Sequence, residues 1–71
     1  MTKDTKVILI KSIKGCIESE RNNLKVLKRV REKWKNREGD HRELLKLFDD
    51  VIEGTQEDIN NMHKEIREIR R

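Results

Sequence analysis

Proline and tyrosine are absent from this sequence, and its 71 residues include one cysteine and three glycines. A single cysteine cannot form a disulfide bond within the chain, and no Cys/His cluster has the spacing of a structural metal site. The one continuous apolar run, residues 7–10, is too short for a membrane span or for the core of a signal peptide. We therefore expect no cofactor, no membrane span, and residence in the cytoplasm or another reducing intracellular compartment.

Charged residues make up 45% of the chain, and the apolar residues are almost all Ile, Leu and Val. High charge is also typical of disorder, but disordered segments lack the regular apolar spacing that this sequence has throughout. A composition without proline and poor in glycine is instead typical of long helices. Because a chain of this size buries little apolar surface, we expect a single all-α domain, residues 1–71, that gains stability by oligomerising.

Apolar residues fill most positions at alternating steps of three and four in two separate stretches of the chain, and the polar exceptions are Glu20, Arg31 and Thr55. This spacing is the a/d pattern of a coiled coil, and it lasts four heptads in each stretch. The first series is Ile10, Ile13, Ile17, Glu20, Leu24, Leu27, Arg31 and Trp34. The second series is Leu45, Phe48, Ile52, Thr55, Ile59, Met62, Ile66 and Ile69. Together the two series predict the seam of a two-helix coiled coil.

The two series are mirror images about the Gly39-Asp40 step, because the residue numbers of each facing pair, from Trp34 with Leu45 outward, sum to 79. Gly39 suits the left-handed position after a helix, and Asp40 with Glu43 has the spacing of a helix N-cap and its box partner. The sequence thus predicts an antiparallel helical hairpin with helices at about 4–38 and 41–70 and a turn at 39–40. We expect Asp4 or Thr2 to cap the first helix.

Glycine within the second helix leaves one alternative open. Gly54 and Thr55, with Asp58 three residues on, could end one helix and cap another, which would give three helices. The seam continues through Gly54 without a change of phase, so we favour one helix.

A second apolar stripe lies beside the seam at g and c positions. A two-helix hairpin needs no such width, and an uncovered apolar strip usually marks an interface, although a merely broad hydrophobic face is the alternative. We expect this stripe to join two hairpins as a four-helix bundle, or to bind a heterologous protein. The predicted interface residues are Leu9, Cys16, Val26, Val30, Leu44, Leu47 and Val51.

Basic residues concentrate in the first half of the chain. Residues 1–39 hold twelve Lys/Arg and five Asp/Glu, whereas residues 40–71 hold six and nine, and the predicted register sets Lys28 near Asp49. Four successive e positions are basic, and such a row could follow a phosphate backbone or an acidic partner, although most charged side chains only face solvent. The candidate contacts are Lys14, Arg21, Lys25, Lys28, Arg29 and Lys35.

Catalytic motifs are missing. The sequence has no Gly-rich phosphate loop, nucleophile motif or metal-ligand spacing. Cys16 and His63 are level across the predicted hairpin but on opposite sides of the seam, and His41 is expected in solvent at the turn. Without an exposed aromatic residue there is no platform for stacking single-stranded bases. We therefore predict no catalytic residue, no metal ligand and no enzymatic activity.

Two functions compete on these grounds. The first is a protein–protein interaction or oligomerisation module, acting as a small adaptor, scaffold or inhibitor through the seam and the second stripe. The alternative is a small nucleic-acid-binding regulator that uses the basic row. In architecture alone, the predicted hairpin is similar to Rop-like RNA-binding bundles and to the antiparallel fingers that bind Rho-type GTPases, with no motif diagnostic of either.

Binding of residues 1–17 to a membrane surface is a third hypothesis. Val7, Ile10, Ile13 and Ile17 alternate there with lysines. The seam accounts for the same apolar residues, so we do not expect a membrane partner.

Overall fold

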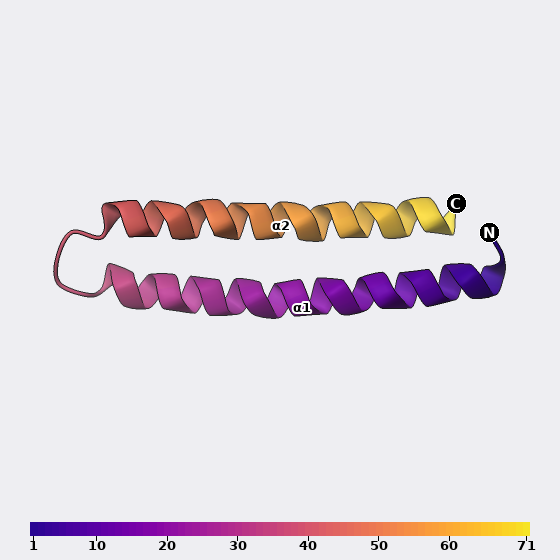
Figure 1. Cartoon of the computed structure of the whole chain (residues 1–71), viewed down its shortest axis with the longest axis horizontal. Helices are drawn as coiled ribbons and strands as arrows, with labels where there is room; N and C mark the ends of the chain where they lie inside the picture. The colour runs from indigo at the N-terminus through magenta and orange to yellow at the C-terminus, as the bar shows by residue number, and fades with distance from the viewer.

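Two long helices packed side by side make up the protein. The computed structural model describes all 71 residues, with helix α1 at Lys3–Lys35 and helix α2 at Arg42–Arg70. The helices run antiparallel, and both chain ends lie together at the end of the rod opposite the connection (Figure 1). The rod measures 56 × 15 × 10 Å between Cα extremes. The predicted all-α hairpin is confirmed, and α2 passes through Gly54 without a break.

The start of α1 is capped by Thr2, one of the two predicted candidates. The Thr2 Oγ1 accepts a hydrogen bond from the backbone N–H of Thr5 at 3.2 Å. This bond satisfies one of the N–H groups that the first turn of a helix leaves without a partner. Asp4 lies in the first turn instead, where its negative charge interacts favourably with the helix dipole.

The connection between the helices is longer than predicted, because α1 ends at Lys35 and not at residue 38. Two residues of the connection, Arg37 and His41, pack against the Trp34 side chain. The Arg37 guanidinium lies 4.3 Å from the centroid of the Trp34 ring. The His41 ring meets the same indole edge-on, with 5.2 Å between centroids. His41 is therefore half-buried and not in open solvent as expected, and its Nε2 lies 2.9 Å from the carbonyl oxygen of Glu38.

Gly39 and Asp40 reverse the chain, though not as a simple cap-and-box pair. Gly39 has the predicted positive φ, +107°. Asp40 accepts the backbone N–H of Arg42 at 3.1 Å, and its carboxylate also receives the Arg42 guanidinium at 2.9 Å. These hydrogen bonds lower the pKa of the Asp40 carboxyl, the side-chain bond first. The N-cap position belongs to His41, without a side-chain hydrogen bond, and Glu43 does not bond to Asp40 as the predicted capping box requires.

Replacing Gly15 or Gly39 by alanine should change the free energy of unfolding in opposite directions. Gly15 lies inside α1 with open space around it, so Gly15→Ala should raise the free energy of unfolding by about 0.5–1 kcal/mol. Gly39→Ala places a side chain at φ +107°, and the new Cβ meets the His41 ring at 3.5 Å. That change should cost about 1–3 kcal/mol. Thermal unfolding followed by circular dichroism checks both, and a stabilised Gly39→Ala variant would contradict the observed turn.

The core is small and lies entirely in the predicted seam. Four side chains are buried, two from each helix, and each occupies an a position. Half-buried seam residues, among them Ile10, Ile13, Ile52 and Met62, pack around them. The buried residues are Ile17, Leu24, Ile59 and Ile66. They occupy the part of the rod away from the connection, and the polar seam residues Glu20 and Thr55 lie beside them in the same stretch.

The polar seam residues find partners without entering the core. Arg31 leaves the seam and bonds to both carboxylate oxygens of Asp49, at 2.6 and 3.3 Å. Asp49 thus pairs with Arg31 and not with Lys28, its predicted neighbour, because the guanidinium offers two parallel N–H groups to one carboxylate. Thr55 Oγ1 donates to the carbonyl of Val51, and Glu20 accepts from Asn23 and not from a lysine.

Candidate functional site

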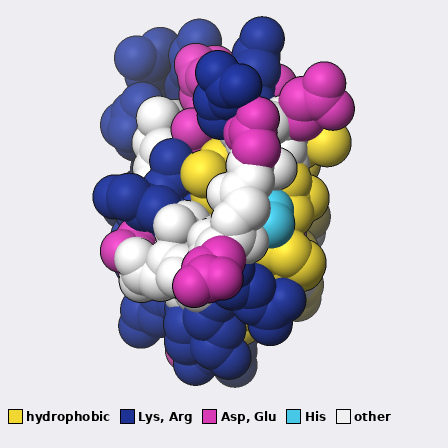
Figure 2. All heavy atoms as spheres, turned by 90° about the vertical axis from the view of Figure 1, so that its left-hand side faces the viewer, with side chains coloured by type: hydrophobic (Ala, Val, Ile, Leu, Met, Phe, Trp, Pro, Cys, Tyr) yellow, Lys and Arg dark blue, Asp and Glu magenta, His cyan; other side chains and the backbone are white.

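The two flanks of the hairpin differ in chemistry. Seen from the connection end, hydrophobic side chains gather along one side of the rod, whereas the opposite side and both edges carry many Lys and Arg side chains with Asp and Glu among them (Figure 2). In the heptad pattern, the first side carries the g positions of both helices and the second carries the e positions. Antiparallel packing sets g beside g and e beside e, so each flank combines residues from both helices.

An apolar hollow marks the hydrophobic flank near the connection. It has a volume of about 150 Å³, and all of its lining residues are hydrophobic. Leu47 and Val51 stand at its rim and are 61% and 50% exposed. The lining residues are Leu27, Leu44, Leu47, Phe48 and Val51. Three of the predicted interface residues therefore meet here, and Leu27 and Phe48 join them from the seam.

The other predicted interface residues are more scattered. Val26 is exposed and Val30 is half-buried. Leu9 is exposed near the chain ends. Cys16 is exposed in a groove whose other lining residues are Glu20, Asp58, Asn61 and Met62. The predicted stripe is thus apolar in its connection half and mostly polar around Cys16, because Glu20, Asp58 and Asn61 line the groove there.

The N-terminal turns of α1 expose two further apolar residues. Val7 is 57% exposed and Ile8 is 65% exposed, so the seam does not account for Val7 as it does for Ile10, Ile13 and Ile17. Neither helix is long and apolar enough to cross a membrane.

A basic groove follows the other flank. It consists of two adjoining hollows of about 670 and 490 Å³ that share Arg21, Lys25 and His63. The four buried core residues form its floor, and Glu18 is its one acidic lining residue. The basic groove is defined here by Lys14, Arg21, Lys25, Lys28, His63 and Arg70.

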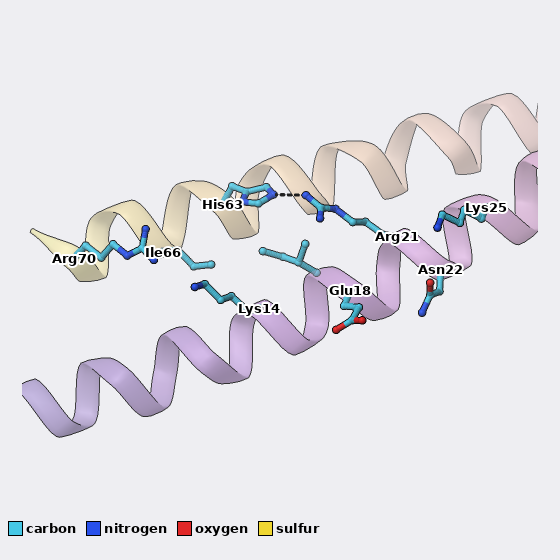
Figure 3. A pocket seen from close by; sticks show the side chains of 9 residues that line it. Lys14, Glu18, Arg21, Asn22, Lys25, His63, Ile66 and Arg70 are labelled. Atoms are coloured by element: carbon cyan, nitrogen blue, oxygen red, sulfur yellow. Dashed lines mark hydrogen bonds between the residues drawn. The ribbon is translucent and has the colours of Figure 1, made fainter.

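Arg21 and His63 join the two helices across this groove. Arg21 Nη2 lies 3.3 Å from His63 Nε2, and the Arg21 side chain spans the space from α1 to the His63 ring beside α2 (Figure 3). Because a guanidinium only donates, His63 Nε2 accepts, which places the proton of the ring on Nδ1. This bond uses one of the five N–H donors of Arg21 and leaves the others available to a ligand.

The sequence predicted four of the six residues that define this groove. Lys14, Arg21, Lys25 and Lys28 line it, but the predicted contacts Arg29 and Lys35 do not. Arg29 occupies the outward f position, and Lys35 is the last residue of α1, beyond the groove. The contributions of His63 and Arg70 were missed. Both occupy e positions of the second series, and extending the e row to that helix identifies them.

No reactive pair or metal cluster accompanies these surfaces. Cys16 and His63 line different grooves, so thiol and imidazole do not meet. No group of three or more His, Cys, Asp or Glu side chains is placed to hold a metal ion.

Comparison with known proteins finds no family model, no curated protein and no solved structure that matches the chain.

Proposed function

We infer that the chain is a non-enzymatic interaction module that self-associates through its hydrophobic flank. Two hairpins packed by these flanks would form a four-helix bundle with both basic grooves outward. In a cell such a module serves as an adaptor, a scaffold or an inhibitor, or as the oligomerisation segment of a larger assembly. The exposed apolar hollow around Leu47 and Val51 carries this inference.

The surface area of the hairpin supports a second copy as the partner. The accessible surface is 5900 Å² for 8.6 kDa. A compact monomer of this mass exposes about 4,700 Å², so the hairpin has an excess of roughly 1,200 Å². A standard protein–protein interface buries about 800 Å² on each partner. Covering one flank of each hairpin therefore accounts for most of the excess.

The weakness of the core supports the same conclusion. Four buried side chains supply little hydrophobic stabilisation, and a chain below about 80 residues usually needs a disulfide, a metal or an oligomer. Leu47, Val51 and Val26 lie where a third and fourth helix would bury them. Self-association thus provides the core that one hairpin lacks.

Solution mass tests this function directly. Light scattering on a sizing column should give twice the chain mass of 8.6 kDa at micromolar concentrations. Because the dimer is stabilised by mass action, the thermal midpoint should also rise with protein concentration. A monomeric mass over a wide concentration range, together with a constant midpoint, would exclude the bundle.

A further inference from the structure

We propose that the basic groove binds the phosphate backbone of a nucleic-acid duplex. This site lies on the flank opposite the apolar hollow, so it does not depend on self-association. Five Lys and Arg side chains and His63 converge on it from both helices, against the single carboxylate of Glu18. The Lys14 and Arg21 side chains extend from α1 into the space between the two helices (Figure 3).

The spacing of the cations suits an extended polyanion. Lys14, Arg21 and Lys28 follow one another at intervals of seven residues along α1. At a rise of 1.5 Å per residue they span about 21 Å, which equals roughly six base-pair steps of a duplex. Arg70 adds a cation from α2 at the end of the groove near Lys14. A single small anion would engage only part of this row.

The polar composition of the groove favours nucleic acid over a protein partner. Its apolar residues are the buried core side chains, which form the floor and offer little area to a docking helix. Protein–protein interfaces are depleted of lysine at their centre, whereas nucleic-acid interfaces are polar and positively charged. Asn22, Gln56 and Asn60 also line the groove, and their amide N–H groups are donors suited to phosphate and sugar oxygens.

The positions of the aromatic residues favour a duplex over a single strand as the ligand of the groove. Proteins that bind single strands stack the bases on exposed aromatic rings. Trp34 and Phe48 are the two aromatic residues of the chain, and both are half-buried outside the basic groove. Binding through phosphates alone therefore suits a duplex, with little dependence on base sequence.

Fluorescence anisotropy with a short labelled RNA duplex and a DNA duplex tests the proposal on the full chain. Neutralising about five phosphates gives a slope of about −4.5 for log K against log salt concentration. Affinity should then fall about 500-fold between 50 and 200 mM salt. The groove variant Lys14→Gln, Arg21→Gln, Lys28→Gln should make the slope shallower by about 2–3 and weaken binding at least about tenfold.

A matched control variant distinguishes the loss of groove cations from a general reduction of net positive charge. Arg29→Gln, Lys33→Gln, Lys64→Gln removes the same number and kinds of cation from exposed positions that do not line the groove. It should bind duplex within about twofold of the natural chain, since it retains the phosphate contacts. Circular dichroism and solution mass establish that both variants keep their fold and assembly.

Three outcomes would overturn the proposal. One is the absence of duplex binding at low salt, and another is an equal loss of affinity in the two variants. The third is binding to vesicles of phosphatidylserine and phosphatidylcholine without binding to either duplex, which would assign the groove to a lipid surface. If one of these outcomes occurs while the groove variant keeps the solution mass of the natural chain, the proposal of duplex binding is wrong but self-association is unaffected.

Discussion

Replacing Leu47 and Val51 together by lysine should convert the self-associated protein into separate hairpins. Both side chains stand at the rim of the apolar hollow and are at least half exposed in one hairpin, so lysine there leaves the hairpin itself intact. In the bundle, each lysine removes apolar burial and adds a charge that must be desolvated. We expect a combined loss of about 3 kcal/mol or more, which weakens association at least about 100-fold.

The measurement is solution mass at several concentrations, with far-UV circular dichroism to follow helicity. The control is Val7→Lys with Ile8→Lys, which also replaces two exposed apolar residues by lysine but lies at the other end of the rod. The control should keep the mass of the natural chain. If it dissociates and the Leu47, Val51 variant does not, the interface lies at the N-terminal turns and not at the apolar hollow.

Shortening Ile59 to alanine should leave most of the protein unfolded. Ile59 is 3% exposed, and its removal would open a cavity in a core of four residues. Deleting a buried isoleucine to alanine costs about 2–5 kcal/mol. A single core in a domain of this size supplies about 3–5 kcal/mol, so the variant loses stability comparable to the whole.

Urea unfolding at a fixed protein concentration measures this loss. Ile8→Ala provides the comparison, because that side chain is 65% exposed and its truncation should change the free energy of unfolding by less than about 0.5 kcal/mol. Equal midpoints for the two variants would mean that the seam does not hold the hairpin together. A fixed concentration is needed because association and folding are linked.

The seam could be predicted from sequence because its spacing follows from backbone geometry. Side chains three and four residues apart lie on one face of any helix, so the positions of Ile17, Leu24, Ile59 and Ile66 required no knowledge of side-chain conformation. The turn followed for a similar reason, since the positive φ of Gly39 reflects a backbone conformation that other residues disfavour. Both features depend on residue type and position, and neither depends on side-chain conformation.

Long side chains were less predictable because they have several partners within reach. Trp34 was assigned to the seam, yet Arg37 and His41 also pack on it, and the chain leaves α1 three residues early. Arg31 was placed opposite Phe48 and instead reaches Asp49, the next residue. Such choices depend on rotamers and on competing charges of similar energy, which spacing does not rank.

The residues of the candidate sites were also predicted only in part. The basic residues of α1 form one row in the sequence and were recognised, whereas Arg70 enters the groove only because the chain folds back. The interface residues were taken as one stripe, but Asp58 and Asn61 beside Cys16 limit the apolar surface to the connection half. The residues of a flank can be predicted only when the heptad positions of both helices are considered together.

Both chain ends lie at the same extremity of the rod (Figure 1). Lys6 Nζ lies 3.5 Å from the carbonyl oxygen of Arg71, so the first and last turns are tied at one extremity. Anything covalently joined to either end is held at that extremity. Trp34, with Arg37 and His41 packed against it, lies toward the other extremity, and the Cα atoms extend over 56 Å along the rod. Residues 36–41, which join the helices, therefore lie at the extremity opposite both chain ends (Figure 1).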